Sequence, residues 1–402
     1  MSNLFYILLL LILVIGNTTF SVVLSLLDYF HNRKETPKKY DRAKEYMKAN
    51  IKLGIVSNIF GAVVLLIILF SGVINYIDLF LRRLTSYEPI IGLLFFGLFG
   101  GAIFFLDIPF SIYKTFYLEK KYGFNKTKQK TFVNDVIKTI ILWIVLGVVG
   151  LLPLLWLFNV YGPSIWIYCW LMVSVLQIFA LIIFPVWIAP FFNTFKILRD
   201  GELKSAIKEY LDSQNIRLDI NNLKVEDSSR RSTKSGASLT GLWWNKRIIL
   251  SDNLIKNHTS EEIVAIVAHE VGHYKKNHIF KKLILYLLES FIMFYLLSLF
   301  LKSSGFYLAL GVTNHSVHVG LFLMSIVYIP LALAFSIVGN ILSRRFELSA
   351  DAFVAKTSSS YALASALSKL EKDNLVNPTP HPVNVFVNYT HPPIAKRIEN
   401  LK

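Results

Sequence analysis

One short segment of the chain combines residue types that bind and activate metal ions: His269-Glu270-Val271-Gly272-His273. On an α-helix, residues four apart differ by about 40° in azimuth, so both imidazoles project from one face and can hold one ion. The carboxylate of Glu270 lies about 100° from His269, where it reaches a metal-bound water rather than the metal. Two imidazoles, a carboxylate and an open water position suit zinc, which lowers the pKa of the water to about 7. The segment therefore predicts a zinc site.

A third protein ligand has to come from elsewhere in the chain. His278 would lie about 180° from the first histidine on a continuous helix, so we expect it to face away, as an interfacial or capping residue. Position 279 is Ile, which excludes the metzincin arrangement of a third histidine. The better candidate is Glu347. Asp351, four residues later, shares the face of Glu347 and is expected to accept the N–H of a metal-bound histidine.

The residues that must position this site belong to a strongly apolar chain. Of its 402 residues, 54% are apolar and only 17% are charged, with 42 Lys and Arg against 26 Asp and Glu. This composition excludes a disordered or collagen-like chain and disfavours an ordinary soluble enzyme. The basic residues form blocks between apolar stretches, which indicates contact with a membrane surface rather than with nucleic acid. We therefore expect a lipid bilayer and no nucleic acid among the partners.

Seven apolar stretches meet or approach the length of about 20 residues that a membrane-spanning helix needs. The sequence thus predicts a mainly α, polytopic membrane protein. The predicted spans cover residues 4–28, 54–78, 90–112, 137–159, 164–190, 281–302 and 317–341.

The basic residues also predict the orientation of these spans. Eight Lys and Arg residues lie between positions 33 and 52, and five Lys residues between positions 120 and 130, whereas the alternate loops hold few. Since cytoplasmic loops are enriched in Lys and Arg, the N-terminus is predicted outside or in a lumen. With seven crossings, residues 191–280 and 342–402 are then cytosolic.

A small α+β fold is predicted within the first of these polar segments. Helical spacing predicts a helix over 201–214, and short runs of strand character cover 223–226, 237–242 and 247–250, with a turn at 245–246. Thr259 and Glu262 form a capping box that begins the helix of the two histidines.

The charges beside the two-histidine segment place it outside the lipid. Glu261 and Glu262 precede it, and Lys275 and Lys276 follow it. Such charges are costly within a bilayer, so the site is expected at the cytosolic membrane surface. This argues against an intramembrane zinc protease.

Taken with these features, the chain resembles the type I CAAX prenyl proteases, which are integral-membrane zinc endopeptidases of the gluzincin group. The resemblance covers nearly all of the chain. It rests on Thr115-Phe116-Tyr117-Leu118-Glu119, Tyr122-Gly123-Phe124-Asn125-Lys126, Pro190-Phe191-Phe192-Asn193, Asn245-Lys246-Arg247-Ile248, the two-histidine segment, Glu347 with Ala350-Asp351, and His391-Pro392-Pro393 with Arg397.

The resemblance implies roles for individual residues. It implies that His269, His273 and Glu347 bind one zinc ion per chain and that Glu270 is the general base. His391 and Arg397 are similar to family residues that approach the substrate near the metal. The resemblance also implies a barrel of helices that encloses a chamber, with the zinc site on its wall.

One place departs from the family pattern. Where the family carries an Asn-Ala-Tyr-like run on the strand that pairs with substrate, this chain reads Gly236-Ala237-Ser238. Pairing of an extended peptide with an edge strand uses backbone groups, so we expect these residues to bind substrate, with side-chain contributions that differ from those of the family.

We expect two domains: a membrane domain of five helices over residues 1–190, and a gluzincin-like zinc protease domain over residues 191–402 that includes the spans 281–302 and 317–341. The predicted function is that of a zinc-dependent membrane endopeptidase acting on peptide or protein substrates. The predicted location is the bacterial inner membrane or the endoplasmic reticulum membrane, with the active site on the cytosolic side.

Two alternatives stay open at this point. One is a quality-control protease that cleaves membrane proteins without requiring a prenyl group. The other, from a different class, is a non-enzymatic seven-helix transporter or scaffold with a structural zinc. A structural site would want a fourth protein ligand, and no Cys or His near Glu347 in the sequence supplies one.

Overall fold

The computed structural model describes residues 3–216, 218–241 and 246–402. It confirms the mainly helical, polytopic fold, because seven helices are long and apolar enough to cross a membrane. These seven cover Asn3–Glu35, Lys38–Phe70, Glu88–Glu119, Gln129–Tyr161, Pro163–Phe192, His278–Phe300 and Ile329–Thr357.

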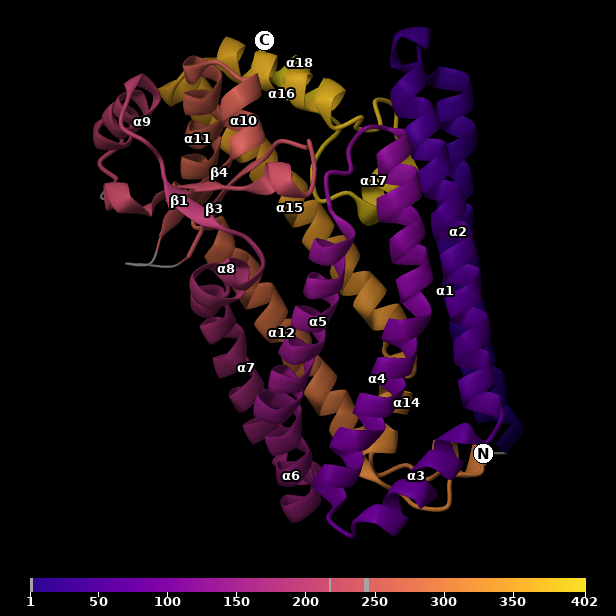
Figure 1. Cartoon of the computed structure of the whole chain (residues 1–402). Coiled ribbons are helices and arrows are strands. Elements are labelled where there is room, and N and C mark those ends of the chain that lie inside the picture. Colours follow the sequence, from indigo (N-terminus) through magenta and orange to yellow (C-terminus); the bar gives the residue numbers. More distant parts are fainter. Residues whose placement is uncertain (1–2, 217, 242–245) are drawn as a thin grey trace.

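The long helices form a body with one terminus at each end (Figure 1). The α-helices of this body are α1 (Asn3–Glu35), α2 (Asp41–Phe70), α3 (Val73–Leu84), α4 (Glu88–Ile112), α5 (Gln129–Leu146), α6 (Leu152–Tyr161), α7 (Trp166–Ile183), α8 (Ala189–Phe192), α12 (His278–Phe300), α13 (Gly305–Ala309), α14 (Val317–Val327) and α15 (Ile329–Thr357). Short π-helical segments continue α4 over Tyr113–Glu119 and join α5 to α6 and α7 to α8.

Two predicted spans have different limits in the structure. The second ends at Phe70, because Gly72 adopts a left-handed backbone (φ 78°) and starts the separate helix α3. The predicted span 317–341 is divided at Tyr328 into α14 and α15. Pro330 lies in the first turn of α15, where its missing N–H costs no helical hydrogen bond.

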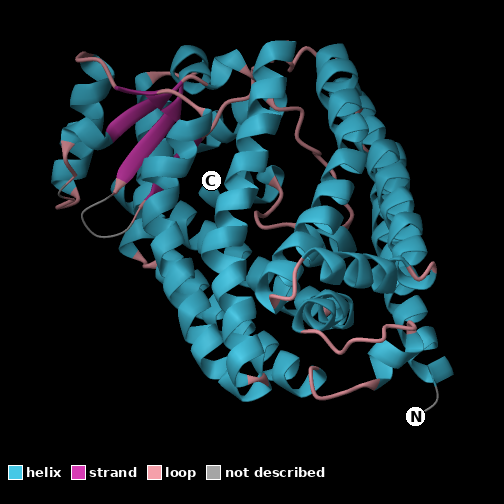
Figure 2. Ribbon diagram, turned by 60° about the horizontal axis from the view of Figure 1, so that its bottom comes forward, coloured by secondary structure: helices cyan, strands magenta, loops and turns pink. Residues whose placement is uncertain are grey.

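A small sheet lies at one end of this body, beside the soluble helices (Figures 1 and 2). Its strands are β1 (Phe195–Ile197), β2 (Leu223–Glu226), β3 (Ala237–Thr240) and β4 (Arg247–Ser251), in the order β1-β2-β4-β3. β2 and β4 are parallel, and the other pairs are antiparallel. The three predicted strands are confirmed, although β3 ends at Thr240. β1 was not predicted, and Asn245 of the predicted turn falls outside the described residues.

The soluble helices surround α11, which carries the two-histidine segment. They are α9 (Glu202–Ser213), α10 (Asp252–Asn257), α11 (Ser260–Lys275), α16 (Ser360–Asp373), α17 (Pro382–Asn388) and α18 (Ile394–Leu401). The predicted capping box is confirmed, since the Thr259 hydroxyl accepts from the Glu262 N–H (3.3 Å) and the Glu262 carboxylate accepts from the Thr259 N–H (3.0 Å). Four residues of α11, among them Val267 and Ala268, are completely buried in the core. α11 is therefore a rigid base for the site.

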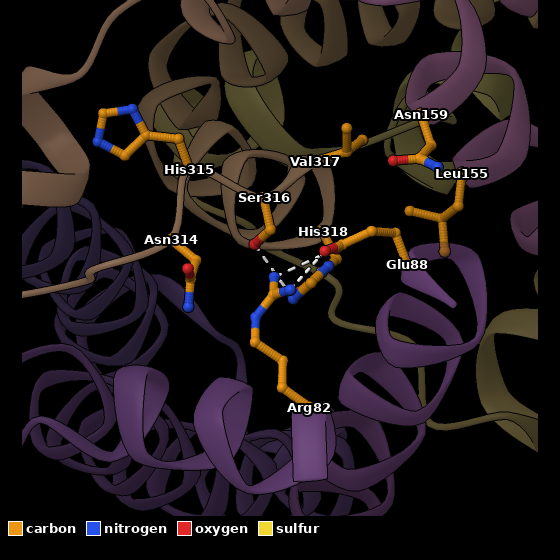
Figure 3. Close-up of a pocket in the computed structure, with 9 residues that line it drawn as sticks. All are labelled: Arg82, Glu88, Leu155, Asn159, Asn314, His315, Ser316, Val317 and His318. Carbon is orange, nitrogen blue, oxygen red and sulfur yellow. Dashed lines mark hydrogen bonds and ion pairs between the residues drawn. The ribbon is translucent and has the colours of Figure 1, made fainter. Parts of the chain in front are cut away.

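A buried polar network lies at the opposite end of the body, near α3 (Figure 1), and Figure 3 shows Arg82, Glu88 and His318 of this network, which come from α3, α4 and α14. Asp78 is completely buried and accepts hydrogen bonds from Arg82 (2.8 Å) and Asn314 (3.1 Å), and it lies 2.7 Å from His318 Nε2. Arg82 also pairs with Glu88. Burial by itself raises the pKa of Asp78, but the hydrogen bonds from His318 and Arg82 outweigh it and lower the pKa to about 2. The network thus fastens the loop before α14 to α3.

Candidate metal centre

The three predicted ligands converge on one point. Nε2 of His269 lies 3.1 Å from Nε2 of His273, and the Glu347 carboxylate oxygens lie 3.2 Å and 3.3 Å from these two atoms. Both histidines come from α11, whereas Glu347 comes from α15. Ligands at about 2.0–2.1 Å from a tetrahedral zinc are separated by about 3.4 Å. The observed separations are close to this value.

The chemistry of these donors fits a metal ion. Oε2 of Glu347 is buried and lies 3.2 Å from Nε2 of His269 and 3.5 Å from the Arg397 guanidinium, but neither contact has the geometry of a hydrogen bond among the described residues. Two imidazole nitrogens at 3.1 Å can share at most one proton, so lone pairs of Nε2 and Oε2 remain directed at their common centre. An unsatisfied buried acceptor of this kind is rare unless an ion or a water completes it. The residues therefore fit a divalent cation.

Small residues bring α11 and α15 close enough for this arrangement. A Cβ atom on Gly272 would lie 3.2 Å from the Cα of Ala350 and 3.2 Å from the Cβ of Phe353. Ala350 is completely buried. Because Gly272 lies next to His273 and Ala350 lies one turn after Glu347, this contact sets the distance between the ligands.

A carboxylate and an arginine orient His269. Asp351 Oδ1 lies 2.9 Å from Nδ1 of His269, and the Arg397 guanidinium donates two hydrogen bonds to Asp351 (2.9 Å and 2.7 Å). With its Nδ1–H donated to Asp351, His269 presents the Nε2 lone pair to the centre. Burial lowers the pKa of His269, but the bonds to Asp351 and Glu347 outweigh it and raise the pKa to about 9.

The prediction that His278 faces away is wrong. Its Nδ1 lies 2.9 Å from Nδ1 of His273, the side chain is only 2% exposed, and its ring stacks on Phe346 at 4.2 Å. α11 ends at Lys275, and Asn277 adopts a left-handed backbone (φ 54°), so α12 starts in a new direction. Extrapolation along one continuous helix therefore failed. Asn277 was the residue in the sequence that could have indicated the end of the helix, because asparagine often adopts the left-handed backbone that ends a helix.

The general-base candidate Glu270 is tied to the edge strand. Its Oε2 accepts the N–H of Leu239 on β3 at 3.1 Å. Burial raises the pKa of the Glu270 carboxyl, and the nearby His269 and His273 work against that rise. A carboxylate held beside the metal ligands, with its other oxygen free of this bond, is suited to accept a proton, and the raised pKa makes it a stronger base than an exposed glutamate.

The predicted substrate-binding residues line the cavity in front of these groups. The cavity has a volume of about 390 Å³, and its walls include Gly236, Ala237, Ser238, Glu270 and His391. The Gly236 carbonyl accepts the N–H of Ser251 on β4. In an antiparallel pair the bonded residues alternate, so the backbone groups of Ala237 and Leu239 point away from β4, into the cavity. The Leu239 bond to Glu270 agrees with this register.

His391 and Arg397 lie at the site in different settings. His391 Nε2 lies 3.3 Å from Glu347, and its side chain is 61% exposed beside the cavity. Burial lowers the pKa of His391, although the charge of Glu347 opposes this. Arg397 is buried and committed to Asp351. His391 is therefore free to contact a ligand in the cavity, whereas Arg397 holds the histidine–carboxylate pair.

Comparisons with known proteins agree with this arrangement. A family model described as CAAX prenyl protease N-terminal, five membrane helices, matches residues 29–194, and a model described as Peptidase family M48 matches residues 198–402. The chain is 36% identical over 293 residues to a CAAX prenyl protease 1 homolog from Arabidopsis thaliana, covering 73% of this chain and 69% of the relative. It is 34% identical over 325 residues to CAAX prenyl protease 1 from Saccharomyces cerevisiae, covering 77% and 71%.

A solved structure is similar over the whole fold. The crystal structure of S. mikatae Ste24p matches with a TM-score of 0.93 and 30% sequence identity, covering 99% of each chain.

Proposed function

We propose a zinc-dependent mechanism for this chain, which belongs to the CAAX prenyl protease family of multi-pass membrane metallopeptidases. His269, His273 and Glu347 hold one zinc ion, and Glu270 is the general base of peptide-bond hydrolysis. The observation that carries the proposal is the convergence of three metal-binding side chains beside a carboxylate that is bonded to the edge strand. A structural zinc would require a fourth side chain, and the metal-binding group among the described residues comprises these three.

The bound zinc supplies Lewis acidity to the scissile carbonyl and to water. Glu270 accepts a proton from the attacking water and returns it to the leaving amine. The Leu239 N–H holds one oxygen of this carboxylate, so the other oxygen is available to the water. Nε2 of His391 is placed to donate to the oxyanion, where one good donor contributes about 3 kcal/mol. Asp351 and Arg397 keep His269 in the tautomer that binds metal.

The substrate adds to β3 as an extended strand. The outward N–H and carbonyl of Ala237 and the outward carbonyl of Leu239 bind the substrate backbone, and Gly236 and Ser238 shape the cavity beside it. Because Gly236 and Ser238 offer little side-chain surface, recognition at this strand depends mainly on backbone hydrogen bonds.

The proposed substrate is a protein with a prenylated C-terminal region, as the names of the relatives indicate. The metal centre lies at the end of the body where the basic loop between α1 and α2 lies, so we place it on the cytosolic side of its membrane. The membrane is the endoplasmic reticulum or a bacterial inner membrane. Mass spectrometry of the products from a prenylated peptide and its unmodified counterpart identifies the substrate class, and equal cleavage of both would favour the quality-control alternative.

The central test is the substitution Glu270→Gln. The amide keeps the shape and a hydrogen-bonding oxygen but loses the base, so we expect zinc content to stay at one per chain while peptidase turnover falls by about 10²–10⁴-fold. Glu261→Gln on the exposed side of the same helix is the matched control and should leave turnover unchanged. Turnover by Glu270→Gln at the wild-type level would refute the assigned role.

A chelator provides the test against the non-enzymatic alternative. Removal of zinc should abolish cleavage of a fluorogenic peptide, and added zinc should restore it. A metal-loaded chain without any peptidase activity would favour the transporter or scaffold.

A further inference from the structure

The five residues 231–235, here called the strap, lead directly into the substrate strand β3 and lie against the membrane helices. In Figure 1, α8 lies next to the sheet. The strap is hydrogen-bonded to the end of α8, to the loop that precedes α5, and to α2.

Arg231 makes the most specific contacts of the strap. Its guanidinium binds both carboxylate oxygens of Asp135 on α5 (3.2 Å and 3.0 Å). It also donates to the side-chain oxygen of Asn193 (2.7 Å) and to the carbonyl of Phe192 at the end of α8 (2.6 Å). One side chain thus joins the cytosolic ends of two membrane segments to the strap. The planar fork of arginine suits this arrangement, and lysine cannot reproduce it.

The backbone of the strap pairs with the loop between α4 and α5. The Lys126 N–H donates to the Arg231 carbonyl (3.0 Å), and the Thr233 N–H donates to the Phe124 carbonyl (3.1 Å). Asn125 and Ser232 form an antiparallel bridge between these bonds. The strap therefore pairs with the membrane domain through one isolated antiparallel bridge and the two backbone hydrogen bonds beside it.

Lys234 adds a third attachment. Its ammonium donates to the Tyr46 hydroxyl on α2 (2.9 Å), lies 3.4 Å from the Glu119 carboxylate and sits 4.5 Å from the centre of the Phe124 ring. The Tyr46 hydroxyl in turn donates to Glu119 (2.5 Å). The lysine charge is thus neutralised by a group of the membrane domain.

Hydrogen bonds hold the backbone at the junction between the strap and β3. The Ser235 N–H and carbonyl are both bonded to the Asn374 side chain (3.2 Å and 3.3 Å), and the Gly236 N–H donates to the Ser251 hydroxyl (3.0 Å). β3 begins at the next residue, Ala237. A displacement of the membrane helices at the strap is therefore transmitted to the substrate strand.

We propose that the strap holds the substrate strand at its distance from the metal ligands and that Arg231 is a positioning residue of the peptidase reaction. This inference rests on the proposed function, because it concerns the strand that binds substrate. Among the described residues β3 pairs with a strand on one side only, so its position depends on contacts outside the sheet. A misplacement of about 1 Å at a reacting group can reduce the rate by about 10²-fold.

The strap also accounts for three sequence blocks of the membrane half. Glu119 ends the block 115–119, Phe124 and Lys126 belong to the block 122–126, and Asn193 ends the block 190–193. The contacts described above do not join any of these three blocks to the metal ligands. Each block does contact the strap. Their shared role is the attachment of β3.

The test compares Arg231→Ala and Arg231→Lys with Arg230→Ala. The neighbouring Arg230 is exposed and pairs with Asp227, so it controls for loss of a positive charge. For both Arg231 variants we expect kcat per bound zinc to fall by about 10-fold to 100-fold, with unchanged zinc affinity. Arg230→Ala should retain wild-type turnover. Normalising to bound zinc removes any loss of folded enzyme, so a merely structural role would leave this quantity unchanged.

Inhibitor binding separates the strand from the metal. A peptide hydroxamate that pairs with β3 should bind the Arg231 variants about 10-fold more weakly, whereas acetohydroxamate, which needs only the metal, should bind all variants equally. Asp135→Ala should reproduce the effect, and the double variant Arg231→Ala/Asp135→Ala should add little to it. If Arg231→Lys kept the wild-type kcat and the wild-type affinity for the peptide hydroxamate, the proposed role of the strap would be refuted. Failure of the wild-type protein to cleave peptides would instead overturn the proposed function.

Discussion

The tight contact of Gly272 on α11 with α15 allows a direct test of how the metal centre is assembled. The change is Gly272→Ala, which adds one methyl group between the two metal-ligating helices. Its Cβ would lie 3.2 Å from the backbone Cα of Ala350 and 3.2 Å from the Cβ of Phe353, tighter than nine in ten real contacts. Because the first of these atoms belongs to the backbone, it cannot swing aside, and α15 has to move by a few tenths of an ångström.

Two opposing effects set the size of the change in stability. Replacing glycine by alanine inside a helix stabilises by about 1 kcal/mol. Overpacking a tight contact costs about 1–3 kcal/mol. The expected net effect is a destabilisation of about 0–2 kcal/mol. The effect on metal binding should be clearer, since a shift of a few tenths of an ångström at Glu347 exceeds the tolerance of about 0.2 Å for zinc ligand distances.

We therefore expect zinc affinity to fall by at least about 10-fold, a loss of about 1.4 kcal/mol. Chelator competition measures the affinity, and thermal unfolding in detergent measures the stability. Gly339→Ala is the matched control on α15, because its Cβ would meet only the Leu285 side-chain tip at 3.5 Å. It should leave zinc affinity unchanged. If Gly272→Ala bound zinc as tightly as this control, the contact would not determine the ligand distance.

Three further predictions concern other parts of the molecule. His278→Gln should weaken zinc binding by about 10–100-fold, because His278 contacts the ring nitrogen of His273 that faces away from the centre. Chelator competition measures the zinc affinity. Unchanged affinity would leave His278 with a packing role only. The raised pKa of His269, about 9, means that a proton must leave when metal binds, so zinc affinity should rise by up to about tenfold per pH unit between pH 6.5 and 8.5. The same proton contributes stability to the metal-free protein that is fully present below pH 6.5, the ordinary histidine pKa, and is lost as the pH rises through about 9, so the unfolding temperature of chelator-treated protein should fall over that window. Asp78→Asn breaks the ion pair of the buried Asp78 with Arg82 and alters its hydrogen bond with His318, so it should destabilise the protein by about 3–5 kcal/mol in thermal unfolding, whereas the exposed Asp41→Asn should have almost no effect.

The strap shows how a sequence block acquires a role only through the fold. The Gly-Phe-Asn run at 123–125 carries no metal ligand and no nucleophile, so spacing along the chain offers it no chemistry. In the structure its backbone pairs with residues more than 100 positions later. The sequence does not indicate that two such segments pair, because only tertiary packing places them side by side.

His278 illustrates the limit of reasoning within one helix. The azimuth of a side chain is predictable only while the helix continues, and the left-handed Asn277 ends it two residues after Lys275. The change of direction at this residue turns His278 toward His273. The same limit applies at Tyr328, where one predicted span became two helices.

The amino-acid sequence alone determined the local features of this protein: the two histidines on one helical face, the capping box before them, three strands and seven apolar helices. These follow from backbone periodicity and hydrophobicity over a few neighbouring residues, which act in any context. The distances from Glu347 to the histidines, from β3 to Glu270 and from Arg231 to Asp135 were decided by tertiary packing alone. Such distances depend on how side chains of separate elements fit together, and a single methyl group at Gly272 is enough to change that fit.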